Sequence, residues 1–257
     1  MTKPFFSVII PTLNEEHYIG VLLQNLLDQE DISFEVVIVD GMSTDKTFEV
    51  VSSFKQRFTD RGIDWSIWQI PKKDSVSVAR NYGAGKSRGM YFVFFDADVA
   101  IGVDFLQKLH DHLVRTKARF ATTRVMPDRT TILLKVLTEC TNYLIFLARF
   151  INKPFILGFN IIIEKTAFSQ IGGFDETALL AEDHALAESS KKHGIRLSYF
   201  SRPILTCNMR RFRHEGTFSL IRKYIQSTFH VLFKGRIRKQ IYTYKLGGGQ
   251  YSKRKTA

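Results

Sequence analysis

The sequence predicts an α/β protein whose central sheet is mostly parallel and is flanked by helices. Segments typical of strands and of helices alternate along the first half of the chain, as in right-handed βαβ units. The run Met90–Phe95 is apolar throughout and rich in strand-forming residues, which indicates a strand buried on both faces. Carboxylates follow this strand and an earlier one, at the position where open α/β sheets bind ligands.

The first predicted strand is Phe5–Ile10. Pro11 is expected to end it, because proline donates no backbone hydrogen bond. Asn14 is the expected cap of a helix over 16–28, whose isoleucine and leucine residues recur at an amphipathic spacing. The next predicted elements are a strand over 34–39, a helix to about residue 58 capped by Ser43 or Asp45, a strand near 64–70 and a helix over 76–86.

The second half predicts fewer strands and longer helices. Its expected elements are a strand over 119–125, a helix over 130–150, a strand over 161–163, a helix that begins within 179–186 and a last helix over 219–233. Charged residues interrupt the apolar helix over 130–150, so no stretch approaches the roughly 20 apolar residues of a membrane-spanning helix. We expect it to be an ordinary core helix. The alternative is a helix that lies in a membrane interface with its apolar side down.

Composition places the chain among folded proteins with a sizeable core, as one domain or one domain with an appendage. Of its 257 residues, 44% are hydrophobic and 22 are phenylalanine. The two cysteines, Cys140 and Cys207, fit neither a metal-binding spacing nor a disulfide framework. Residues 1–4 lead into the first strand without the layout of a signal peptide. We therefore expect a cytoplasmic protein.

Positive charge is concentrated at the carboxyl end. The formal net charge is +12, and residues 210–257 hold 13 Lys or Arg against the single acid Glu215. This segment favours an anionic partner, which would be a membrane surface, a polyanionic acceptor or nucleic acid. A solvated tail is the alternative for the last dozen residues. The balanced charge of residues 1–209 argues against a surface that tracks nucleic-acid phosphates there.

Asp96 and Asp98 form the first candidate site. Carboxylates one residue apart offer hard oxygen ligands to Mg²⁺ or Mn²⁺, which keep coordination positions for substrate phosphates. The alternative is a turn in which an aspartate caps the next helix. Asn14, Glu15 and Asp40 also follow predicted strands. A shared ligand-binding edge explains this recurrence better than a series of helix caps does.

Motifs of two other nucleotide-binding classes are missing. No Gly-x-Gly-x-x-Gly follows the first strand, and no Walker-type Gly-Lys-Ser/Thr loop occurs. These absences argue against a dinucleotide-dependent oxidoreductase and against a P-loop ATPase.

In their order and spacing, the motifs resemble those of family 2 glycosyltransferases of the GT-A fold, such as dolichyl-phosphate-mannose-synthase-like and other bacterial and archaeal family 2 enzymes. The resemblance rests on Val8–Glu15, Val39–Thr47, Ala79–Gly83, Phe95–Asp98, Ile171–Asp175 and Ala181–Asp183. It implies a GT-A domain over 1–209, with a nucleotide-binding half over 1–115 and an acceptor half over 116–209. A basic carboxyl-terminal helix and tail over 210–257 would follow.

The resemblance also implies roles for individual residues. The donor nucleotide would contact Pro11, Leu13, Glu15, Asp40, Arg80 and Asp96. The metal, Mn²⁺ or Mg²⁺, would be held by Asp98, Asp96 and the late His214. Contacts to the acceptor or to phosphate would come from Gly158, Arg210, Arg211 and Arg213. Asp183 would be the catalytic base, supported by Glu182.

Together these roles imply a metal-dependent, inverting glycosyltransferase. It would move a sugar from a nucleotide-diphosphate sugar to an acceptor hydroxyl or lipid phosphate, and a UDP-sugar is preferred over a GDP-sugar as the donor. The acceptor would be a saccharide or polyprenyl-phosphate-linked, and the basic segment would attach the protein peripherally to the inner face of the cell membrane. The Gln-x-x-Arg-Trp pattern of processive synthases is missing, which disfavours processive synthesis.

The alternatives are a sugar-phosphate nucleotidyltransferase, which would not need Glu182 and Asp183 as a base, and a nucleic-acid-binding protein that uses the basic carboxyl terminus. No specific nucleic-acid partner is expected.

Overall fold

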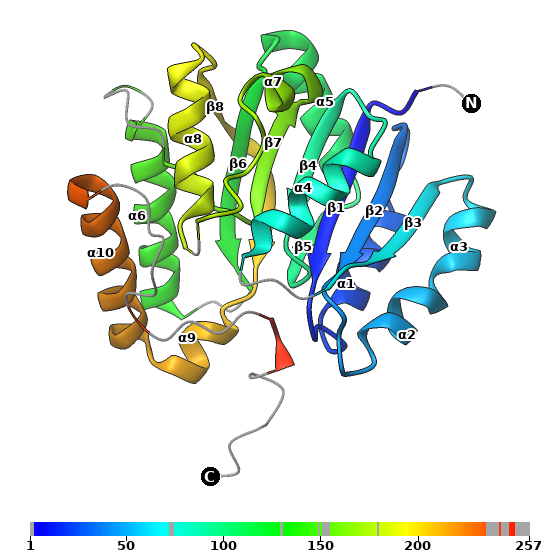
Figure 1. Ribbon diagram of the computed structural model, residues 1–257, viewed down its shortest axis with the longest axis horizontal. Helices are drawn as coiled ribbons and strands as arrows, with labels where there is room; N and C mark the ends of the chain where they lie inside the picture. Colours follow the sequence, from blue (N-terminus) through cyan, green and yellow to red (C-terminus); the bar gives the residue numbers. More distant parts are fainter. Residues whose placement is uncertain are drawn as a thin grey trace.

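The computed structural model describes residues 3–71, 75–128, 131–148, 150, 155–178, 180–234, 242 and 247–249. Within these ranges an eight-stranded sheet has the order β3-β2-β1-β4-β7-β6-β8-β5, and helices flank it (Figure 1). Apolar side chains form one core cluster on each face of the sheet. The architecture is therefore the layered α/β arrangement predicted from the sequence.

The first half of the sheet is parallel, as predicted. Its strands are β1 (Phe6–Thr12), β2 (Phe34–Asp40), β3 (Asp64–Gln69) and β4 (Tyr91–Phe95). The expectation that Pro11 ends the first strand is wrong, because β1 continues through Pro11 to Thr12. The pairing of β1 with β4 stops at Ile9 and Phe94, so the missing N–H of Pro11 breaks no ladder on that side.

Helices of this half cover both faces of the sheet. They are α1 (Ile19–Leu27), α2 (Thr47–Ser53), α3 (Lys55–Asp60), α4 (Val76–Lys86) and α5 (Phe105–Thr116). The stripe predicted for the first helix is confirmed, since the five apolar residues of α1 that were expected to face the core are buried. Helix α4 approaches β1 very closely, because a Cβ on Gly83 would lie 2.5 Å from a methyl carbon of Ile9.

The second half of the sheet holds two strands that the sequence predicted, β6 and β7, and two that it did not, β5 and β8. The sheet continues with β7 (Asn160–Glu164), β6 (Phe120–Pro127), β8 (Leu197–Cys207) and β5 (Val99–Ile101). The contacts of β7 with β4 and of β5 with β8 are antiparallel, whereas β6 and β8 are parallel. The nucleotide-binding and acceptor halves expected from the sequence thus share one continuous sheet.

The remaining helices are α6 (Ile132–Ala148), α7 (Lys165–Gln170), α8 (Glu182–Lys192), α9 (Arg210–Glu215) and α10 (Thr217–Lys234). Figure 1 shows α6 and α10 at the same side of the molecule. No helix in the described ranges combines the length and the apolar character needed to cross a membrane.

Helix α6 is not the ordinary core helix that the sequence favoured. Its inward side consists of Leu134, Thr138, Asn142, Ile145 and Ala148, and the amide of Asn142 bonds both backbone groups of Val125. Six other large apolar or aromatic side chains of the helix are exposed, namely Ile132, Leu133, Val136, Tyr143, Leu144 and Leu147. The helix docks through Leu134, Ile145 and three small or polar residues, and it leaves an apolar face uncovered within the described residues.

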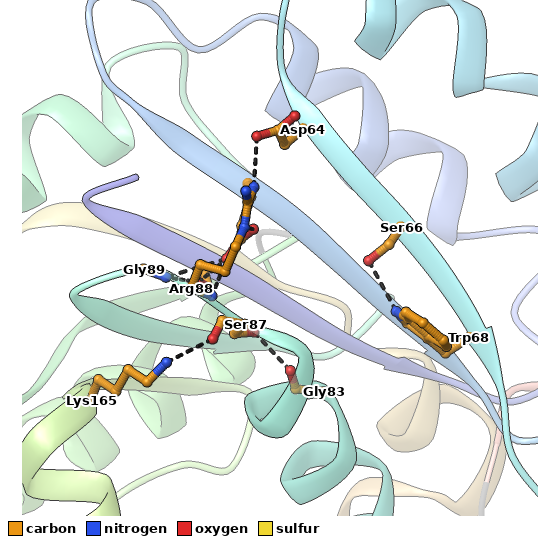
Figure 2. Close-up of polar contacts among 10 residues, drawn as sticks. Asp64, Ser66, Trp68, Gly83, Ser87, Arg88, Gly89 and Lys165 are labelled. Carbon is orange, nitrogen blue, oxygen red and sulfur yellow. Dashed lines mark hydrogen bonds and ion pairs between the residues drawn. The ribbon is translucent and has the colours of Figure 1, made fainter. Parts of the chain in front are cut away.

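A network of charges closes the amino edge of the parallel strands. Arg88 pairs with Glu35 on β2 at 3.0 Å and with Asp64 on β3 at 2.6 Å (Figure 2). Glu35 also accepts hydrogen bonds from Ser7 and Gly89. This network stabilises the end of the sheet opposite to the one where ligands are expected.

Candidate active site

The loop after β1 is built by side chains that bond to its backbone. Asn14 has a left-handed backbone conformation with φ of 55°, and its side chain accepts a hydrogen bond from the N–H of Thr44 at 2.8 Å. The next N–H, that of Glu15, donates to the hydroxyl of Thr47 at 2.7 Å. The expectation that Asn14 caps the first helix is therefore wrong. Asn14 instead ties the loop after β1 to the loop after β2, because both loops emerge at the same edge of the sheet.

Asp40, at the end of β2, is fully buried. Its carboxylate accepts hydrogen bonds from the N–H and hydroxyl of Ser43, from Thr12 and from the side-chain amide of Gln69. Met42, which lies between Asp40 and Ser43 in the chain, has a left-handed backbone conformation with φ of 59°. Asp40 thus organises its own loop, and its expected contact with a nucleotide base stays a prediction.

Arg80 connects three elements at the carboxyl edge. The side chain is only 2% exposed and belongs to α4. One nitrogen lies 2.9 Å from Asp96, after β4, and another lies 2.7 Å from Glu182, at the start of α8. The ring of Phe174 lies 5.2 Å from the guanidinium carbon. Arg80 therefore holds a carboxylate expected on the donor side next to one expected on the acceptor side.

Arg210 forms a second clamp beside the first. Its two terminal nitrogens lie 2.6 and 2.7 Å from the two carboxylate oxygens of Glu15, which is a bidentate geometry. Its Nε lies 3.0 Å from a carboxylate oxygen of Asp98. The ring of Tyr18 lies 4.5 Å from the guanidinium carbon. The sequence predicted a phosphate contact for Arg210, whereas the structure shows it joining Glu15 to Asp98.

The pair Glu182 and Asp183 begins α8 behind a strained turn. Ala181 has φ of 59°, which is unusual for a residue with a side chain. Asp183 accepts the backbone N–H of His184 at 2.8 Å. A Cβ on Gly158 would lie 3.4 Å from both carboxylates and 3.2 Å from Arg80. The predicted acceptor glycine and the predicted base therefore lie together.

Burial raises the pKa of several of these acids, even though arginines lie beside them. Burial raises the pKa of Glu15 to about 7, outweighing the opposite effect of Arg210. Burial also raises the pKa of Asp98 and of Glu182, although Arg210 and Arg80 oppose these shifts. The two arginines thus pair with four carboxylates, those of Glu15, Asp96, Asp98 and Glu182, and Asp183 lies beside them.

This donor set fits a divalent cation. Asp96 and Asp98 supply hard oxygen ligands, and their side chains are 39% and 17% exposed, so at least one remains open to solvent. A diphosphate would be repelled by so many acids unless a cation lay between them. Among the described residues no three His, Cys, Asp or Glu side chains gather as a metal site. Two carboxylates together with diphosphate oxygens form the usual Mg²⁺ arrangement.

The other predicted residues lie around this centre. Arg213 pairs with Asp128 at 3.3 Å, and Arg211 is near enough to Asp98 to lower its pKa. His214 lies on α9, and its metal contact stays a prediction. Pro11 is buried in β1, whereas Leu13 is partly exposed in the loop that follows.

Two further groups of residues at this edge were not predicted from the sequence. Asn81 bonds both backbone groups of Phe174 at 2.9 Å and thereby holds the loop that leads toward α8. The segment Gly247–Gly249 lies against the loop after β1, where the N–H of Gly248 donates to the carbonyl oxygen of Leu13 at 3.0 Å. The adjacent Arg80 could have drawn attention to Asn81, but no local pattern signals the contact of the glycines.

Comparison with known proteins gives a family match over most of the chain. The model of the family described as Glycosyl transferase family 2 matches residues 7–172. An uncharacterized glycosyltransferase of Haemophilus influenzae is 31% identical over 126 residues, which are 47% of this chain and 49% of that protein. A dolichyl N-acetyl-α-D-glucosaminyl phosphate 3-β-D-2,3-diacetamido-2,3-dideoxy-β-D-glucuronosyltransferase of Methanococcus voltae is 36% identical over 105 residues, which are 40% of this chain and 32% of that protein. These matches span half or less of each relative.

Solved structures share the fold at low sequence identity. Staphylococcus aureus TarS 1–349 in complex with UDP-GlcNAc has a TM-score of 0.63 and 22% identity, over 79% of this chain and 58% of that chain. The mannosyltransferase PcManGT from Pyrobaculum calidifontis, in complex with GDP-Man and Mn²⁺, has a TM-score of 0.68 and 20% identity, over 88% of this chain and 65% of that chain. The predicted GT-A fold is confirmed.

Proposed function

Because this chain belongs to glycosyl transferase family 2, we propose that it transfers a sugar from a nucleotide-diphosphate sugar to an acceptor with inversion at the anomeric carbon, assisted by Mn²⁺ or Mg²⁺. The observation that carries the proposal is the bridge made by Arg80. It holds Asp96, after β4, and Glu182, at the start of α8, within ion-pair distance of one guanidinium. Donor and acceptor groups must lie this close for direct transfer.

Asp183 is the proposed general base. One of its oxygens accepts the backbone N–H of His184 at 2.8 Å. The other lies on the side of Gly158, where the missing side chain leaves room for an acceptor. From there Asp183 takes the proton of the acceptor hydroxyl as the oxygen attacks the anomeric carbon and the bond to the diphosphate breaks. An acceptor that attacks through an ionised phosphate would have no proton to give, and Asp183 would then position it.

Glu182 has a supporting part. It is buried and paired with Arg80, so it fixes the start of α8 and the direction of the neighbouring base. Asp96 and Asp98 are the proposed metal ligands. When bound, the cation neutralises charge that develops on the departing diphosphate.

The donor nucleotide is proposed to lie along the loops after β1 and β2. Pro11, Leu13, Glu15 and Asp40 belong to these segments, which are joined by the contact of Asn14 with Thr44. Structural relatives were solved with UDP-GlcNAc and with GDP-Man, so both bases suit the fold. Of the two, we propose a UDP-sugar rather than a GDP-sugar as the donor.

A membrane-bound or lipid-linked acceptor is the proposed partner. Two features support it: residues 210–257 carry a surplus of positive charge, and α6 exposes an apolar face. One relative is named for transfer to a dolichyl-linked sugar phosphate. Cations attract anionic headgroups, and apolar side chains enter the headgroup region. An anionic bilayer fits better than a second copy of the chain, which would bring two strongly basic segments together.

The test of the proposed function is thermal unfolding with UDP, GDP, CDP or dTDP, each with and without Mn²⁺. A ligand at 100 times its dissociation constant stabilises by about 2.7 kcal/mol, which for a chain of this size raises the melting temperature by roughly 5–10 °C. We expect a metal-dependent rise with one diphosphate in the wild type and none in Asp98→Asn. Val114→Asn, an exposed change on α5, is the control and should keep the rise.

Two results would contradict the proposal. If none of the four diphosphates shifts the wild type, the donor site is absent. If the enzyme instead makes an activated sugar from a nucleoside triphosphate and a sugar phosphate, it is a nucleotidyltransferase. Salt-resistant retardation of nucleic acid in a gel would favour the remaining alternative, since generic attraction to the tail weakens as salt rises.

A further inference from the structure

The segment Gly247–Gly249 makes a long-range contact with the loop after β1. Figure 1 shows this short segment in red beside α9. The N–H of Gly248 donates to the carbonyl oxygen of Leu13 at 3.0 Å, although the two residues are near opposite ends of the chain. Leu13 belongs to the segment proposed to bind the nucleotide. The end of the chain therefore takes part in shaping this site.

The contact requires residues without side chains. A Cβ on Gly248 would lie 2.5 Å from a carboxylate oxygen of Glu15, 2.6 Å from the carbonyl oxygen of Asn14 and 2.7 Å from a terminal nitrogen of Arg210. Gly247 has a φ of +85°, and a Cβ there would overlap the carbonyl oxygen of Leu13. Only glycine lets two backbones approach this closely. A flexible linker would not require such close contact between two backbone segments.

The glycines cover one particular part of the site. Beneath them lies the ion pair of Glu15 and Arg210, whose side chains are 8% and 4% exposed. The Nε of Arg210 lies 3.0 Å from Asp98, a proposed metal ligand. Asp40, the residue proposed to contact the base, bonds instead to Ser43 and Gln69. The covered part is therefore the one proposed for the diphosphate and its cation.

From these contacts we propose that Gly247–Gly249 form the outer wall of the nucleoside-diphosphate site. The segment acts by position: it fixes the backbone of Leu13 and holds Arg210 beside Asp98. This inference rests on the proposed function and adds the carboxyl-terminal glycines to its donor site. Because the wall serves the diphosphate end, its loss should weaken binding of a nucleoside diphosphate more than binding of the monophosphate with the same base.

Two truncated proteins isolate the contribution of the glycines. One ends at Leu246 and the other at Gly249, and both lose the same cations, Lys253, Arg254 and Lys255. Dissociation constants for UDP, UMP, GDP and GMP in Mn²⁺ are measured by titration calorimetry, with unfolding curves to verify that each protein is folded. We expect the protein that ends at Leu246 to bind the diphosphate at least tenfold more weakly. The protein that ends at Gly249 should match the full chain.

A point substitution tests the same contact in the full-length protein. Gly248→Val should weaken diphosphate binding at least tenfold, since its side chain collides with Glu15 and Arg210. Gly85→Ala is the matched control, because no atom lies within 4 Å of the Cβ that it adds. It should bind like the wild type. Monophosphate affinity should change less than diphosphate affinity in Gly248→Val, which separates positioning of the diphosphate from a general loss of structure.

Each other result overturns the inference. Equal diphosphate affinity in the two truncated proteins would show that the glycines contribute nothing. Tighter binding after their removal would show that they block the site. Equal weakening for monophosphate and diphosphate would mean a structural role only. A full-length protein that binds none of these nucleotides would overturn the proposed function as well, so the two failures are distinguishable.

Discussion

Arg80 on α4 and Glu182 on α8 form a buried ion pair with 2.7 Å between Nη1 and Oε1, although 102 positions separate them in the chain. The same guanidinium reaches Asp96 at 2.9 Å. The carboxyl end of β4 and the start of α8 are thus fixed relative to each other by one side chain. This relationship sets the distance between the proposed donor and acceptor sides.

Replacing Arg80 by Met should harm both folding and transfer. Removing one partner of a buried pair costs about 3–5 kcal/mol, because the remaining carboxylate stays buried without its counter-ion. Urea unfolding measures this loss, and sugar transfer per folded molecule measures the effect on the site. Arg80→Lys keeps the charge but not the forked geometry, so it should recover part of the stability and little of the transfer activity.

Arg88→Met is the matched control for Arg80. Arg88 also joins two carboxylates, those of Glu35 and Asp64, but at the opposite edge of the sheet (Figure 2). Its loss should lower stability less, because half of the side chain is exposed, and should leave nucleotide affinity unchanged. Equal loss of nucleotide binding in both variants would contradict the special position of Arg80.

Asp183→Asn should abolish most of the transfer while preserving donor binding. A general base contributes about 10²–10⁴-fold to the rate, whereas for folding Asp183 accepts a hydrogen bond from a backbone N–H of its own helix. Initial rates and calorimetry with the nucleoside diphosphate separate the two effects. Glu188→Gln, on the exposed side of α8, is the control and should transfer normally. Proton NMR of the product should show inversion, and a retained anomeric configuration would exclude Asp183 as the base.

Glu15 should make stability fall as pH rises from about 4.5 to 7. Burial raises its pKa from 4.5 to about 7, so in this window the folded protein holds a proton that the unfolded chain has released. The free energy of unfolding therefore decreases by up to about 3 kcal/mol across the window and then levels off. Glu15→Gln removes this titration and should lack that part of the decrease. Metal-free urea unfolding at several pH values tests it, and parallel curves for the two proteins would contradict it.

The exposed face of α6 should bind anionic bilayers. Leu133 and Leu144 are 50% and 58% exposed, so replacing both by Glu should cost little folding energy but should oppose insertion among headgroups. We expect sedimentation with phosphatidylcholine–phosphatidylglycerol vesicles to drop severalfold. Val114→Glu, on α5 and 56% exposed, is the control and should sediment like the wild type. Unchanged vesicle binding with an altered oligomeric state would show that this face binds protein instead.

Much of the fold could be predicted because its signals are local. The buried strand that ends at Phe95 and the apolar stripe of α1 each depend on residues close together in the chain. The position of Asp96 and Asp98 at the carboxyl edge follows from the alternation of strands and helices. Pairing in the second half could not be predicted, since β5 and β8 carry no strong period and are defined by partners far away in sequence.

The sequence by itself determined the α/β class, the edge that carries the acids and the family to which they belong. Tertiary structure alone decided which charges meet, namely Arg80 with Glu182 and Arg210 with Glu15 and Asp98. It also decided that the backbone of Gly248 bonds that of Leu13. It also turned the apolar side of α6 outward. The physical reason is that periodicity and composition act over a few residues, whereas ion pairs and close backbone contacts depend on how distant segments are brought together by the sheet.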